Sequence, residues 1–142
     1  MLRYFDTSVI LLSILNDPRR DEGLKYLKQG GLTSELGLVE LVSYLSRNLN
    51  EDPLPYAIKI INTFNIKIMN INGLRLSPFG DLTEVAHLAI NVSRQVKLRT
   101  LDLLHLTYAL LLNVDEIITA DKEFIKAEKF LKERNITLNI VK

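Results

Sequence analysis

The sequence predicts an α/β fold in which helices cover both faces of a mainly parallel sheet. Short segments rich in β-branched and aromatic residues alternate with longer segments of helical periodicity, and no linker, low-complexity tract or repeat divides them. Right-handed crossovers between parallel strands place helices on both faces, which gives a three-layer α/β/α sandwich. Because 142 residues fit one domain, we expect a single domain over residues 1–142.

The expected elements of the first half follow from apolar periodicity and from capping residues. Thr7 or Ser8 can cap the first helix, Pro18 fits the first turn of the second, and Ser34 is a good N-cap for the third. The third helix should bury Leu36, Val39, Val42, Leu45 and Leu49. The elements are strand 2–5, helix Thr7–Leu15, helix Pro18–Gln29, strand 32–33, helix Glu35–Asn48, helix Tyr56–Phe64 and strand 67–71.

The second half continues the alternation. A loop over residues 77–81 precedes a helix, and Thr100 is a suitable N-cap for the helix that follows it. The β-branched run EIIT then indicates a short buried strand. The elements are helix Leu82–Val96, helix Leu101–Leu112, strand Glu116–Thr119, helix 122–133 and strand Thr137–Val141.

Composition excludes several classes of function. A net charge of +1 gives no overall basic field for nucleic acid, although it allows a locally basic rim. The absence of cysteine excludes disulfides, cysteine-ligated zinc and thiol catalysis, and only 2 histidines make a histidine-rich metal site improbable. No apolar run reaches the ~20 residues that cross a bilayer, so we expect a soluble, cytoplasmic protein without a membrane partner.

Acidic residues mark the ends of buried elements. Asp6 closes the first strand, and Asp121 comes two residues after Thr119, where a second strand ends. Ligands of open parallel sheets bind beyond the carboxyl ends of the strands, so both acids should reach one crevice if these strands are neighbours. Asp102 and Glu40, from two apolar helices, would line the same crevice.

Each acid except Asp6 also has a purely structural explanation. Asp102 favours the helix macrodipole, Asp121 can cap the following helix, and Glu40 can pair with Arg47 on its own helix. Taken together, however, carboxylates 4 Å apart repel by roughly 4 kcal/mol per pair. Such a cluster must take up protons or a cation, and an all-oxygen site suits Mg²⁺ or Mn²⁺.

A divalent ion held in this way suits the hydrolysis of a phosphodiester, because it can activate the attacking water and stabilise the leaving oxygen. We assign Asp6 and Asp102 as the principal ligands. Asp121 and Glu40 would bind a second ion or orient the water as general base. The hydroxyl of Thr119 would hold a carboxylate or a water.

The chain resembles the PIN domain family, specifically its VapC-type toxin ribonucleases. The matching segments are YFDTSVILL, TSELGLVEL, LRTLDLLHLTYALLL and DEIITADKEF, which place Asp6, Glu40, Asp102 and Asp121 on the acidic positions of the family and Thr119 on its hydroxyl position. The resemblance implies Mg²⁺- or Mn²⁺-dependent cleavage of single-stranded RNA, frequent homodimerisation, and neutralisation by an antitoxin.

Several basic residues and one histidine are further candidates. Arg94, Lys97 and Arg99 precede Asp102 and could grip RNA phosphates, or they could simply form a solvated helix end. Arg19, Arg20 and Lys122 are weaker candidates of the same kind. His105, three residues after Asp102, could touch the site, but packing at the core edge is the preferred interpretation.

Two alternatives of other classes stay open. The first is an inactive PIN-like scaffold that only binds a partner. The second is a phospho-acceptor signalling module, since Asp6 follows a first strand, although such modules start with paired acids and need a later lysine. The sequence thus favours a metal-dependent endoribonuclease, the toxin half of a VapBC-type toxin–antitoxin pair.

Overall fold

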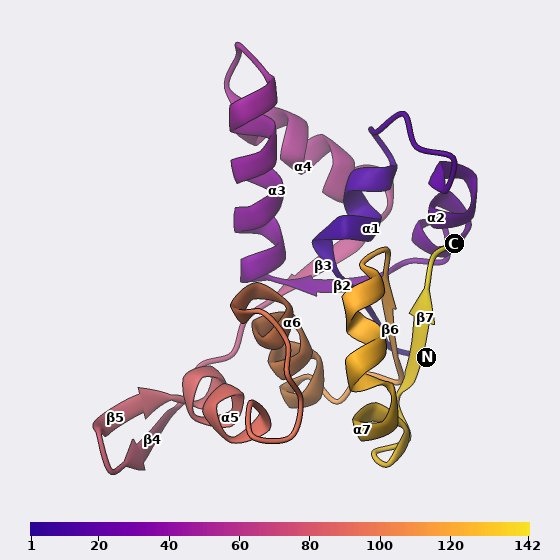
Figure 1. The fold of residues 1–142 in the computed structure, drawn as a ribbon. Helices are drawn as coiled ribbons and strands as arrows, with labels where there is room; N and C mark the ends of the chain where they lie inside the picture. The colour runs from indigo at the N-terminus through magenta and orange to yellow at the C-terminus, as the bar shows by residue number, and fades with distance from the viewer.

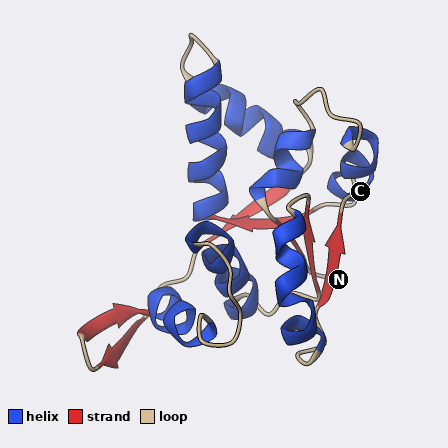
Figure 2. Cartoon of the chain, in the orientation of Figure 1, coloured by secondary structure: helices blue, strands red, loops and turns tan.

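The computed structural model describes residues 1–142 and has a five-stranded parallel sheet at its centre. The strand order is β3-β2-β1-β6-β7, and every neighbouring pair is parallel. Figure 1 shows the sheet between two groups of helices, and Figure 2 separates the strands from the helices by colour. The strands are β1 (Arg3–Phe5), β2 (Gly31–Ser34), β3 (Ile66–Met69), β6 (Glu116–Thr119) and β7 (Thr137–Ile140).

The two faces of the sheet bury two separate hydrophobic clusters, which confirms the three-layer architecture. Side chains of a strand alternate between faces, so Phe5 and Ile118 join one cluster whereas Tyr4 and Ile117 join the other. The Phe5 cluster is covered by α1 (Thr7–Leu12), α2 (Arg20–Leu27), α3 (Glu35–Asn48) and α4 (Pro53–Thr63). The Tyr4 cluster is covered by α5 (Glu84–Val92), α6 (Thr100–Leu111), the 3₁₀ helix η1 (Lys122–Ala127) and α7 (Glu128–Lys132).

Capping explains several of the observed helix starts. Ser34 accepts a hydrogen bond from the Gly37 amide and begins α3 where the sequence predicted. The helix α1 begins at Thr7 as predicted, but Asp6, not Thr7 or Ser8, occupies the N-cap position, and the helix stops at Leu12 instead of Leu15. Likewise Arg99, not Thr100, is the N-cap residue of α6.

The largest difference from the sequence prediction is a β-hairpin where a loop and a helix start were expected. Strands β4 (Leu74–Ser77) and β5 (Gly80–Thr83) pair antiparallel across a two-residue turn, and α5 begins only at Glu84. Gly80 follows the turn with a φ of 108°, which suits glycine because it has no Cβ. The hairpin projects from the body of the molecule (Figure 1), so its apolar side chains lack the burial that a strand prediction relies on.

Two further predictions were wrong in detail. The expected helix 122–133 is divided into η1 and α7. On α3, Val39 is 63% exposed although a core position was expected, whereas Leu41 and Leu45 are buried. Because α3 is apolar on more than one stripe, its neighbours in the fold, rather than its own periodicity, decide which stripe is buried.

None of the helices combines the length and the apolarity that crossing a bilayer requires.

Candidate active site

The centre of the sheet brings two strand ends together. β1 lies beside β6, with Phe5 opposite Ile118, and the Asp6 amide donates to the Ile118 carbonyl over 3.0 Å. The strand order reverses here, because β2 and β3 extend to one side of β1 whereas β6 and β7 extend to the other. Crevices for ligands form at such switch points. The condition under which Asp6 and Asp121 could share a crevice is therefore met.

A cavity of about 220 Å³ opens at this position, and all four predicted acids line it. Asp6 and Asp121 come from the ends of β1 and β6, Glu40 comes from α3, and Asp102 comes from the first turn of α6. The remaining lining residues are Thr7, Ser8, Leu11, Tyr44 and Arg47. Residues that are more than a hundred positions apart thus face one small space.

Asp6 is held by two hydroxyl groups. Its Oδ2 accepts hydrogen bonds from Ser8 Oγ at 2.6 Å and from Thr119 Oγ1 at 2.8 Å, and the residue is only 4% exposed. Thr119 Oγ1 also accepts from the Asp121 amide at 3.0 Å. A buried carboxylate needs such donors, because burying it without hydrogen bonds is more unfavourable than the roughly 2–7 kcal/mol that applies to a neutral polar group. Asp6 therefore has a fixed orientation at the floor of the cavity.

Glu40 pairs with His105 rather than with Arg47, so the proposed intrahelical pair does not form. Its Oε1 contacts His105 Nε2 and accepts from Thr7 Oγ1 at 3.1 Å, whereas Arg47 donates to Ser43 Oγ at 2.6 Å. Burial opposes ionisation of Glu40, but the hydrogen bond and the charge of His105 outweigh it, so the pKa of Glu40 is lowered. Glu40 is accordingly ionised in the neutral range.

Asp102 is the carboxyl group whose negative charge is offset least by neighbouring donors and cations. Partial burial, the negative charges of Asp121 and Asp6, and the hydrogen bond with Asp121 raise its pKa to about 6. Asp121 also accepts from the Glu123 amide at 2.9 Å and thereby caps η1, so its structural explanation holds as well. The cavity therefore carries negative charge that the protein itself does not neutralise.

His105 proves more than a packing residue at the core edge. It is 1% exposed, and its Nε2 lies 3.3 Å from Asp6 Oδ1 as well as in contact with Glu40. Burial lowers the pKa of His105, but the hydrogen bond with Glu40 and the charges of Asp6, Glu40 and Asp102 outweigh this effect and raise it. Its spacing of three residues from Asp102 was the sequence signal for this contact. Ser8 was predicted only as a possible helix cap and not as a site residue, although the DTS triplet places it two residues after Asp6.

The basic candidates do not line the cavity. Arg94, Lys97 and Arg99 are exposed on the segment between α5 and α6. Lys97 Nζ donates to the Ser93 carbonyl at 3.2 Å, which is a helix-end role. Arg19 instead reaches the strand ends, because its Nη1 donates to the Ala120 carbonyl at 2.8 Å. The basic residue that does line the cavity is Arg47.

The donor set fits a hard divalent cation. Four carboxylates line the cavity, and ligand atoms of Asp6, Glu40 and His105 lie within 4.8 Å of one another. Mg²⁺ and Mn²⁺ prefer carboxylate oxygen and water as ligands. The raised pKa of Asp102 marks the uncompensated charge that such a cation would neutralise.

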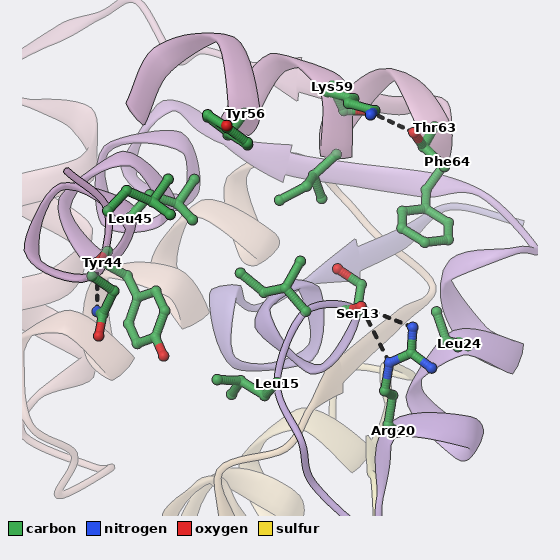
Figure 3. A pocket seen from close by; sticks show the side chains of 14 residues that line it. Ser13, Leu15, Arg20, Leu24, Tyr44, Leu45, Tyr56, Lys59, Thr63 and Phe64 are labelled. Atoms are coloured by element: carbon green, nitrogen blue, oxygen red, sulfur yellow. Dashed lines mark hydrogen bonds between the residues drawn. The ribbon is translucent and has the colours of Figure 1, made fainter. Parts of the chain in front are cut away.

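A larger apolar cleft of about 520 Å³ lies next to this site, between α2, α3, α4 and the segment 13–15 that follows α1. Figure 3 shows Tyr44, Tyr56 and Phe64 around it, and Arg20 at its rim donating to the Ser13 carbonyl at 3.2 Å. Tyr44 lines both the cleft and the acidic cavity. A molecule that fills the cleft would therefore reach the edge of the acidic site.

Comparisons with known proteins place the fold. The PIN domain model matches residues 3–130. Similar solved structures include FitAcB from Neisseria gonorrhoeae, at 16% identity and a TM-score of 0.65 over 97% of this chain and 96% of that one. VapC20 from Mycobacterium tuberculosis, a sarcin-ricin loop cleaving toxin, has 15% identity and a TM-score of 0.64 over 88% and 94%. VapBC2 from Rickettsia felis, bound to a promoter DNA fragment, has 14% identity and a TM-score of 0.63 over 100% of both chains. A search of curated protein sequences found no match.

Proposed function

Because the chain belongs to the PIN domain family, we propose that it is a metal-dependent endoribonuclease that hydrolyses single-stranded RNA, and the toxin of a VapBC-type pair. The observation that carries this proposal is the meeting of Asp6, Glu40, Asp102 and Asp121 around one cavity at the switch point of the sheet. Similarity to toxin and toxin–antitoxin structures supports it at the level of the fold.

Mg²⁺ or Mn²⁺ would be held by Asp6 and Asp102, with Asp121 and Glu40 completing the site. The bound ion would supply charge neutralisation for the phosphate and a lowered pKa for the attacking water. Asp102 and Asp121 then gain a counter-charge, which relieves the repulsion that raises the pKa of Asp102.

Residues of the chain itself account for orientation and substrate contact. Ser8 and Thr119 hold the Asp6 carboxylate, so it needs no rearrangement to act as a ligand. Glu40 Oε1 is engaged by His105 and Thr7, which leaves Oε2 available to accept a proton from a water molecule. Arg47 offers a positive charge to an RNA phosphate at the edge of the cavity.

The proposed antitoxin would occupy the apolar cleft beside the acidic cavity. The cleft is lined mainly by hydrophobic side chains, and Tyr44 connects it with the site, so a bound segment could block access to the acids. Solved relatives with this fold include a toxin–antitoxin complex from Klebsiella pneumoniae, at 17% identity. A homodimer is proposed in addition, and Arg94, Lys97 and Arg99 remain candidates for contacts with RNA beyond the cavity.

Cleavage of a fluorescent single-stranded RNA in the presence of Mn²⁺ tests the proposal. We expect Asp6→Asn and Asp102→Asn to abolish cleavage, whereas Asp81→Asn, the same change at an exposed hairpin position, retains it. Circular dichroism checks that every variant is folded. Wild-type rates in either cavity variant would refute the site assignment.

A second test addresses the alternative of an inactive scaffold. His105 contacts both Glu40 and Asp6, and could offset their charge in place of a metal ion. A scaffold would show neither RNA cleavage nor a rise in melting temperature with Mn²⁺, because nothing would bind the native state preferentially. For a phospho-acceptor, the lining of the cavity provides an arginine but no lysine. Hydroxylamine-sensitive labelling of Asp6 by a small phosphodonor would support that class instead.

A further inference from the structure

A chain of buried hydrogen bonds leads from the backbone of α3 to the acidic cavity. The Gly37 amide donates to Ser34 Oγ at 3.4 Å, and Ser34 Oγ lies 2.8 Å from the Tyr4 hydroxyl. The Tyr4 hydroxyl lies 2.6 Å from His105 Nδ1, and the other ring nitrogen of His105 contacts Glu40. Ser34, Tyr4 and His105 are all buried to 1% exposure or less. The chain joins β1, β2, α3 and α6.

The direction of these hydrogen bonds follows from their first member. A backbone amide can only donate, so Ser34 accepts from Gly37. The Gly37 amide is a donor, so Tyr4 is the hydrogen-bond partner of Ser34 that can accept, and the Ser34 proton points to the Tyr4 oxygen. The Tyr4 hydroxyl proton then points to His105 Nδ1. Burial raises the pKa of the Tyr4 phenol, so the hydroxyl keeps the proton that it donates.

The tautomer of His105 decides whether an N–H group or a lone pair faces the Glu40 carboxylate. In the neutral ring, Nδ1 as the acceptor leaves the proton on Nε2, and this N–H points to Glu40 Oε1 and towards Asp6 Oδ1 at 3.3 Å. The opposite tautomer would set two lone pairs, from Nε2 and from the carboxylate, against each other. The Tyr4 hydroxyl thus selects the tautomer that holds the Glu40 carboxylate.

We propose that Tyr4 is a positioning residue of the acidic site, which acts through His105 to fix the Glu40 carboxylate. Its effect on RNA cleavage rests on the proposed function, whereas its effect on the histidine does not. Tyr4→Phe removes one hydroxyl group and leaves the buried ring in place. Mutating an outer hydrogen-bond partner of a metal site typically lowers metal affinity or activity about 10–100-fold. We expect Tyr4→Phe to weaken Mn²⁺ binding by about 10-fold.

The direct test is ¹⁵N NMR of the histidine rings in alkaline buffer, above the raised pKa of His105, where the two neutral tautomers give different signals. The chain has 2 histidines, so His87→Gln assigns the His105 signals. The wild-type protein should show the Nε2–H tautomer, and Tyr4→Phe should show a mixture. An Nδ1–H tautomer of the neutral ring in the wild type would overturn the proposal, and this arm needs no variant to fold.

The second readout is Mn²⁺ affinity, measured from the electron paramagnetic resonance signal of the free ion. Tyr108→Phe is the matched control, because Tyr108 on α6 donates to Glu35 Oε1 on α3 at 3.1 Å, outside the cavity lining. Equal Mn²⁺ affinities of Tyr4→Phe and Tyr108→Phe would refute the positioning role. Absence of RNA cleavage in all proteins, with the histidine signals as expected, would count against the proposed function alone.

Discussion

Replacing Asp102 with Asn should stabilise the metal-free protein, although we expect the same change to abolish the proposed cleavage. Burial and the neighbouring acids raise the pKa of Asp102 from 3.8 to about 6. The native state therefore holds this proton more tightly than the unfolded state does. By linkage, stability is highest below the unfolded pKa and falls as the pH rises through the folded pKa. At about pH 8 the unfavourable contribution is complete, and Asn removes it.

The expected magnitude follows from the size of the shift. A shift of this size in a fully buried group corresponds to roughly 3 kcal/mol, at roughly 1.4 kcal/mol per pKa unit. Asp102 is only half-buried, so solvent screening reduces the contribution to about 1.5 kcal/mol. Asn also loses the favourable effect of a carboxylate in the first turn of α6, roughly 0.5 kcal/mol. The net stabilisation is about 1 kcal/mol, or a melting temperature higher by about 3–4 °C.

Urea denaturation in EDTA, followed by circular dichroism between about pH 4.5 and pH 8, measures this difference. Asp81→Asn, which removes the same charge from the exposed hairpin, should leave the free energy of unfolding unchanged within about 0.5 kcal/mol. The reasoning would be refuted if Asp102→Asn were no more stable than the wild type at about pH 8. A difference that did not shrink towards pH 4.5 would refute it equally.

The other predictions concern metal, hydroxyl and packing contacts. Mn²⁺ at about 100 times its Kd should stabilise the wild-type protein by about 2.7 kcal/mol in calorimetry, and an unchanged melting temperature would exclude binding. Thr119→Val removes a 2.8 Å hydrogen bond to Asp6 and should lower the free energy of unfolding by about 1–3 kcal/mol, which Thr119→Ser should largely restore. Gly37→Ala would set a Cβ 2.2 Å from Thr33 Oγ1, so a loss of about 1–3 kcal/mol is expected in urea titrations. Phe79→Ser, at an 82% exposed position, should leave the melting temperature unchanged, and a drop would mean that the hairpin packs in solution.

Local chemistry made part of the site predictable. Asp6 follows an apolar strand and Asp102 lies in a first helical turn, and both features are written in a few consecutive residues. The bounds of β6 and α3 were predicted for the same reason, because β-branched runs and N-caps act within one element. The hairpin β4–β5 escaped prediction because its exposed Leu76 and Phe79 give no burial pattern.

The sequence by itself determined the alternation of strands and helices and the position of each acid at the end or on the face of an element. The tertiary structure alone decided that β1 and β6 are neighbours and that Glu40 pairs with His105 instead of Arg47. It also decided that Tyr4 forms a hydrogen bond with the other ring nitrogen of His105. The physical reason is the separation along the sequence over which each effect acts. Periodicity and capping act over a few residues, whereas the Tyr4–His105 contact joins positions 101 residues apart. Such a contact exists only once the buried faces of sheet and helices have packed.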